Sequence, residues 1–182
     1  SLDRRKKQIM KDNMLLVSEL LEIKDLVYHT CNFEFSNLVI DSESEEYQSC
    51  SFKLNSFEII HRFSKITPTK IGQFVTIWKR NNEGITAPFD VSDNFDFIVI
   101  TSKSDKNLGQ FVFPKSVLLE KGIISNNNTS GKRGIRVYPP WDIPTSKKAE
   151  KTQLWQTKYF YSINKDAFDI ELVKKLFTKT IL

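Results

Sequence analysis

The sequence predicts an α+β (mixed α/β) protein with a central mixed β-sheet of about five strands, flanked by N-terminal, middle and C-terminal helices. Three observations favour this class. An amphipathic helical pattern runs over residues 3–29, β-branched and aromatic runs fill the centre from residue 57 to residue 138, and helical patterns return after residue 146.

The first element is expected to be one amphipathic helix over residues 3–29. Its basic start, Arg4 to Lys7, is typical of a solvated helix end, and the acidic run 41–46 further along favours a loop or a helix start. The apolar side chains that recur near helical spacing are Ile9, Leu16, Val17, Leu20, Leu21, Ile23, Val27 and Tyr28.

Five segments of the centre read as strands because they are rich in β-branched and aromatic residues. Pro68 and Gly72 separate the first two, which we expect to pair as a hairpin joined by a turn. The predicted strands are 57–63, 73–78, 95–100, 110–113 and 134–138.

Three further helices are expected after the fourth strand. Pro114 ends that strand, and residues 116–121 read as a short helix that is closed by Gly122. Residues 146–161 follow as a longer helix, and Asn164 is the expected N-cap of the last one.

Cysteine spacing and hydropathy limit the classes of protein to which this chain can belong. Cys31 and Cys50 form neither a zinc pattern nor a disulfide framework. Ser18 and Glu19 interrupt the apolar stretch 14–17, so no signal-peptide core is expected. No apolar run is long enough for a membrane span. We therefore expect a cytoplasmic protein without a membrane partner.

The net charge of +5 is unevenly distributed along the chain. Residues 1–60 carry seven Lys and Arg against eleven Asp and Glu, whereas residues 101–160 carry eleven against four. Residues 61–80 add five basic residues and no acid. This segregation favours a polyanionic partner for the middle and later parts of the chain.

Four blocks of sequence carry a family resemblance. They are 65–75 with 78–80, 109–115, 131–133 with 137–142, and 151–156 with 159–160. These blocks resemble the MepB family, bacterial proteins named after a member encoded beside a multidrug efflux pump. The resemblance covers roughly residues 30–165 and implies a single MepB-like domain over residues 1–182, with a helix added at 1–29 and another at 166–182. It also implies an architecture similar to that of restriction-endonuclease-like nucleases, by analogy of fold alone.

A nuclease of that architecture needs an acid at the start of one strand and an acid-x-Lys triple on the next, which together hold Mg²⁺ and orient water. Asp93 and Asp96 suit the first acid, but the next strand reads Gln110 to Val112 and lacks both partners. Glu58 is a possible displaced carboxylate, and Lys115 or Lys70 a possible displaced cation. No cofactor or metal is otherwise expected.

The basic blocks favour contacts to nucleic-acid phosphates, with interleaved tryptophans as stacking platforms or as core residues. The predicted nucleic-acid-binding residues are Lys65, Lys70, Trp78, Lys79, Arg80, Lys115, Lys132, Arg133, Arg136, Trp141, Lys147, Lys148 and Lys151.

The hypothesis from sequence is a nucleic-acid-binding protein without catalysis, with DNA and RNA both open as partners. One alternative is a divalent-metal-dependent nuclease with a displaced active site. Another is a protein-interaction or regulatory module whose basic face meets an acidic partner, with residues 41–46 able to mask that face. The sequence pattern indicates no particular oligomeric state.

Overall fold

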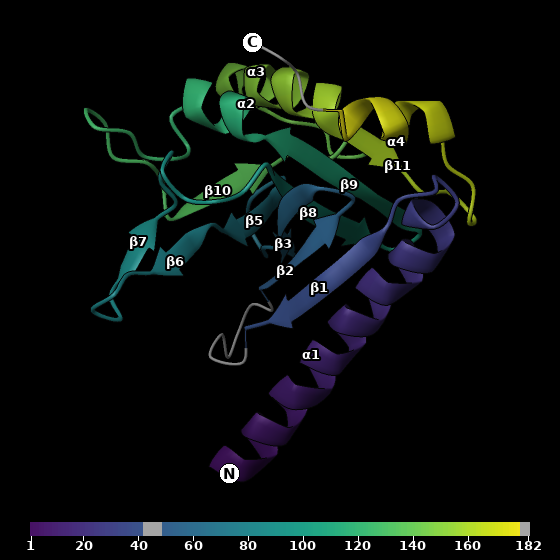
Figure 1. The fold of residues 1–182 in the computed structure, drawn as a ribbon, viewed down its shortest axis with the longest axis horizontal. Helices are drawn as coiled ribbons and strands as arrows, with labels where there is room; N and C mark the ends of the chain where they lie inside the picture. The colour runs from purple at the N-terminus through teal and green to yellow at the C-terminus, as the bar shows by residue number, and fades with distance from the viewer. Residues whose placement is uncertain (42–48, 179–182) are drawn as a thin grey trace.

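The computed structural model describes residues 1–41 and 49–178. The six strands of its central sheet are β1 (Phe35–Ile40), β2 (Cys50–Leu54), β3 (Phe57–Phe63), β8 (Phe97–Ser104), β9 (Asn107–Pro114) and β11 (Phe160–Ser162). They lie in the order β1-β2-β3-β8-β9-β11 (Figure 1). Strands β3 and β8 are parallel, and the other neighbours are antiparallel. The predicted α+β class with a mixed central sheet is confirmed.

The connection between the parallel strands β3 and β8 spans residues 64–96 and contains no helix. A parallel pair needs a long crossover, which is usually helical. Here it consists of short strands: β4 (Lys65–Ile66), β5 (Gln73–Thr76), β6 (Trp78–Arg80) and β7 (Thr86–Pro88). Strands β4 and β5 join β10 (Gly134–Val137) in a three-stranded sheet, and β6 pairs with β7.

The predicted pairing of strands 57–63 and 73–78 is wrong. The first strand is present at the predicted bounds, but it pairs with β2 and β8, while β5 pairs with β4 and β10. The predicted strand 134–138 likewise joins the smaller sheet. Local sequence signals mark strands, whereas pairing depends on contacts between distant segments.

The helices are α1 (Leu2–Ile23), α2 (Lys115–Glu120), α3 (Lys147–Gln156) and α4 (Ile170–Leu176). A π-helical turn, Lys24–Tyr28, continues α1, as the predicted helix 3–29 required. The predicted helix 146–161 ends early because Phe160 and Tyr161 pair with β9 as β11. The last helix is capped by Asp169, whose Oδ1 accepts from Leu172 N at 3.1 Å, and not by Asn164.

Strands β1 and β2 were not predicted. In β1, Asn37 has a positive φ of 56° and the register shifts between Ser36 and Val39, which breaks the alternation of inward and outward side chains that marks a regular strand. The acidic run predicted at residues 41–46 lies outside the described residues beyond Asp41.

Alternating side chains give the central sheet two apolar faces. In β8, Phe97 and Val99 face a core closed by the end of α1, the π-helical turn and α4. Ile98 and Ile100 face a second core closed by α2, the smaller sheet and Trp155 of α3. None of the helices in the part of the chain that the structure describes is both long and apolar enough to cross a bilayer.

A chain of polar contacts crosses the first of these faces, from β2 to β11. His61 Nε2 lies 2.7 Å from Thr101 Oγ1, which also accepts from Gln110 Nε2 at 3.0 Å. Gln110 Oε1 in turn accepts from the hydroxyls of Tyr28 and Tyr161. We call this chain the polar ladder; its members are Cys50, His61, Thr101, Gln110, Tyr161 and Tyr28.

His61 makes the stability of the fold depend on pH. Burial, together with the nearby charge of Arg62, lowers the pKa of His61 to about 3. The unfolded chain, with a His pKa of about 6.5, therefore binds this proton more tightly, and the free energy of unfolding falls as the pH drops from about 6.5 toward 3. Between about pH 7 and pH 5, this group alone should cost about 2 kcal/mol.

Chemical denaturation over that range, with wild type and His61→Gln side by side, measures the effect. Glutamine removes the titration and keeps a polar group near Thr101, so its profile should be flatter by about 2 kcal/mol. Two parallel profiles would show that His61 is not the group responsible.

Candidate nucleic-acid interface

A basic concave surface lies between β10, the start of α3, the end of α2 and the loop before β5. It is a hollow of about 510 Å³. We call it the basic hollow. Its lining contains five basic side chains and no Asp or Glu. The basic residues are Lys70, Lys121, Lys132, Arg136 and Lys148.

Arg136 holds the loop before β5, which forms one wall of the basic hollow. Its Nη1 donates to Thr67 Oγ1 at 3.0 Å and to the carbonyls of Ile71 and Gly72 at 3.3 and 3.2 Å. Gly72 has a φ of 82°, and a Cβ there would lie 2.8 Å from the Tyr138 ring. The loop therefore needs glycine at this position, and its attachment to β10 places Lys70 at the edge of the hollow.

The first turn of α3 forms a second wall. Ser146 caps the helix by accepting from Ala149 N at 3.1 Å. The adjacent Lys148 lines the hollow, where the helix dipole also favours an anion. Gln156, which is buried, joins α3 to β10 by accepting from Tyr138 N at 2.8 Å and donating to Arg136 O at 3.1 Å.

Lys121 was missing from the sequence prediction. It follows α2 immediately, and its Nζ lies 5.4 Å from the centre of the Trp155 ring, which itself packs on Phe113 at 5.3 Å. A single lysine before Gly122 gives no clustering signal in the sequence. Only the packing of α2 against α3 brings it to the hollow.

Four of the predicted binding residues, Lys70, Lys132, Arg136 and Lys148, come together in the basic hollow. The others lie elsewhere. Arg133 donates to Thr86 O at 3.3 Å, outside the lining. Lys147 and Lys151 are exposed on α3, and Lys65 is exposed on β4.

The predicted tryptophans take packing positions. Trp78 lies under the guanidinium of Arg80, 5.3 Å from its ring centre, and Arg80 also donates to Gly84 O. Trp141 is half-buried and packs edge-on against Phe160, with ring centres 5.8 Å apart. Neither ring lines the basic hollow.

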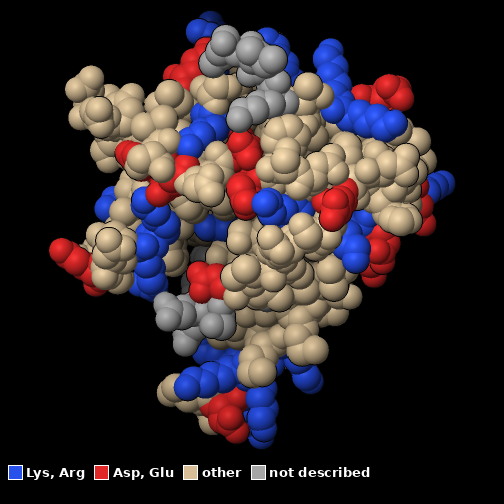
Figure 2. Space-filling model, viewed as in Figure 1, with Lys and Arg blue, Asp and Glu red and all other residues tan. Residues whose placement is uncertain are grey.

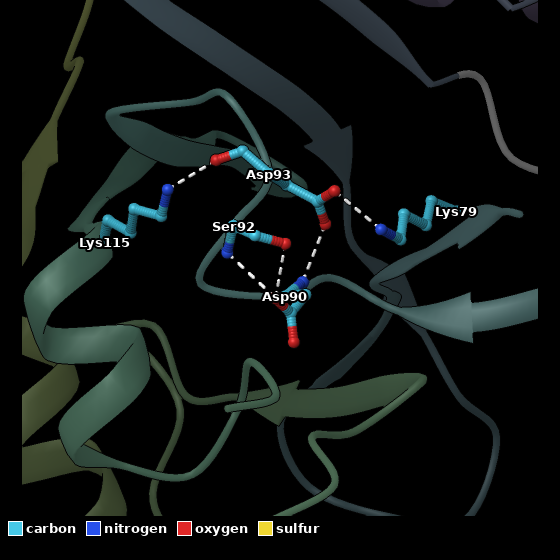
Figure 3. A network of polar contacts seen from close by, with 5 residues as sticks. All are labelled: Lys79, Asp90, Ser92, Asp93 and Lys115. Atoms are coloured by element: carbon cyan, nitrogen blue, oxygen red, sulfur yellow. Dashed lines mark hydrogen bonds and ion pairs between the residues drawn. The ribbon is translucent and has the colours of Figure 1, made fainter. Parts of the chain in front are cut away.

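Two predicted cations, Lys79 and Lys115, belong to a separate network around Asp93 (Figure 3). Lys79 Nζ lies 2.6 Å from Asp93 Oδ1, and Asp93 Oδ2 accepts from Asp90 N at 2.7 Å. Lys115 donates to the backbone carbonyl of Asp93 and lies over the Phe95 ring.

Asp90 completes this network as a turn residue. Its carboxylate accepts from the Ser92 hydroxyl and backbone N–H at 2.6 and 2.9 Å, and these bonds lower the pKa of Asp90. The contacts hold the turn between β7 and β8.

The remaining nuclease candidates, Asp96 and Glu58, also have separate partners. Asp96 Oδ2 accepts from the backbone N–H of Glu58 at 2.8 Å, and Glu58 pairs with Lys53 at 3.6 Å. Across residues 1–41 and 49–178, no group of three or more His, Cys, Asp or Glu side chains is arranged to hold a metal ion.

One sequence family and one solved structure are similar to this chain. The sequence model of the MepB-like family matches residues 41–162. A crystal structure of MepB superimposes with a TM-score of 0.69 at 34% sequence identity, over 72% of this chain and 88% of that one. No curated protein matches the chain in sequence. The family match begins directly after β1, ends with β11 and includes every basic residue of the hollow. The chain therefore belongs to the MepB-like family.

Proposed function

We propose that this protein binds nucleic acid through the basic hollow, mainly by contacts to backbone phosphates. One observation carries the proposal: five cationic side chains from separate segments converge on one concave surface whose lining contains no carboxylate. A polyanion that enters such a surface releases condensed counterions, which drives binding without reading sequence.

The cationic side chains of the hollow are preorganised for an anion in the free protein. The loop that carries Lys70 is fixed by Arg136, and the segment that carries Lys148 is a capped helix. Less side-chain and loop entropy is therefore lost on binding than at a mobile basic tail. Tyr138 and Trp155 add aromatic surface to the lining.

Replacing Lys121, Lys132 and Lys148 together with Ala tests the site. We expect at least a roughly tenfold loss of affinity for labelled DNA or RNA, because up to three phosphate contacts disappear. The slope of log affinity against log salt should shrink by up to about 3. Fluorescence anisotropy over a salt series, with single- and double-stranded oligonucleotides of both kinds, measures both effects.

The matched control replaces Lys106, Lys158 and Lys175 with Ala. These lysines are exposed and lie outside the hollow, and the control loses the same three charges. We expect this control to bind nearly as wild type does. Equal losses in both triple variants would mean that net charge alone attracts the nucleic acid, and would refute the assignment to the hollow.

Asp93→Asn tests the nuclease alternative. Because Asp93 neutralises Lys79 and holds the turn at Asp90, we expect unchanged or slightly stronger binding and about 1 kcal/mol of lost stability. Gel analysis of oligonucleotides incubated with Mg²⁺ should show no cleavage by wild type or variant. A Mg²⁺-dependent cut that the substitution abolishes would instead make Asp93 a catalytic ligand.

A further inference from the structure

The first turns of α1 extend away from the rest of the molecule (Figure 1). Residues 1–8 are all exposed, and burial against the core begins only at Leu20 and Ile23. Apolar side chains on the extension face solvent, including Met14, which is 70% exposed, and Leu15, which is 65% exposed. An unsupported helix of this length is marginal in water, so a packing partner would stabilise it.

A groove of about 590 Å³ lies beside the other end of the same helix. We call it the acidic groove. Its apolar floor contains Ile23, Leu26, Leu108 and Ile163. Its rim carries Glu19, Glu22, Asp25 and Asp166 with a single cation, Lys103, which already bonds to Glu19. The acidic groove shares no residue with the basic hollow.

The two ends of α1 carry opposite charge. Residues 1–12 contain five Lys and Arg against two Asp, whereas Glu19, Glu22 and Asp25 line the acidic groove. In Figure 2 the narrow end of the molecule, where α1 begins, carries basic side chains around a small acidic patch.

This charge pattern is complementary to itself about Leu15. Residues 11, 15, 19 and 22 follow each other at helical spacing, so they share one face. If two copies of α1 lie antiparallel with Leu15 against Leu15, Lys11 of each faces Glu19 of the other. Three residues further out, Gln8 faces Glu22, and beyond them Arg5 faces Asp25.

We infer that this face of α1 and the acidic groove bind a second copy of the chain in an antiparallel, two-fold symmetric pair. The apolar floor of the groove receives the extended helix, and the opposite charges fix its direction and register. Exposed ion pairs are individually weak, so their contribution is mainly to specificity. A two-fold axis uses the same surface on both copies, as this pattern requires.

Sedimentation velocity on the full chain, across a range of concentrations, tests the inference. Wild type should approach twice the 21.2 kDa mass of one chain, and salt should weaken the association. Leu15→Glu places two carboxylates at the symmetry axis and should give a monomer. Met14→Glu, also highly exposed but on another face of the helix, should leave the dimer intact.

Complementary charge reversals make the test specific. Arg5→Glu with Gln8→Glu places carboxylates opposite Asp25 and Glu22 of the partner copy, and Glu22→Lys with Asp25→Lys places cations opposite Gln8 and Arg5. Each double variant should be monomeric alone, while an equimolar mixture should form a heterodimer. Recovery on mixing also shows that both variants are folded.

A wild-type chain that stays monomeric at every concentration overturns the inference, and would leave the acidic groove to a basic segment of another protein. The inference is also overturned if the mixture stays monomeric, or if Met14→Glu dissociates the pair while Leu15→Glu does not.

Discussion

The register of the central sheet is the constraint on which the other features depend, and the polar ladder fixes it. Gln110 is fully buried, and its amide serves Tyr28, Thr101 and Tyr161 at once. A slip of β9 by one residue would turn Gln110 away and place Phe111 among these polar groups. Several buried groups would lose their partners, each at a cost of about 1–3 kcal/mol. The ladder therefore admits one register.

The same register positions the basic hollow on the opposite face of the sheet. Gln110 and Val112 point toward one core, so Phe111 and Phe113 must point toward the other. Phe113 packs against Trp155, and the ammonium group of Lys121 lies over the Trp155 ring. The hydrogen bonds of Gln110 therefore help to set the position of Lys121 on the other side of the sheet. The two packed aromatic rings, Phe113 and Trp155, connect them.

Sequence patterns predicted the elements that have strong local signals. They failed where contacts between distant segments decide the structure. The strand 57–63 was found at its observed bounds because its β-branched and aromatic residues are concentrated. Strand β11 was read as the end of a helix, since nothing local in Phe160–Ser162 reveals its pairing with β9. At the candidate site, Lys132 and Lys148 stood in visible clusters, but Lys121 was isolated in sequence. Lys79 lay in a cluster too, yet it pairs with Asp93, and charge counting cannot detect such a pair.

The non-helical crossover between β3 and β8 has a consequence for how the molecule is assembled. One wall of the basic hollow belongs to this crossover, and it is held by hydrogen bonds to β10, more than 60 residues further along the chain. Closing such a long loop is entropically costly, so contacts of this kind tend to form late in folding. The crossover also has short strands and an exposed loop at residues 68–71, which are features of regions that open locally before the core does. We therefore expect the basic hollow to form late in folding, so that an intact hollow would indicate that the whole chain has reached the native topology.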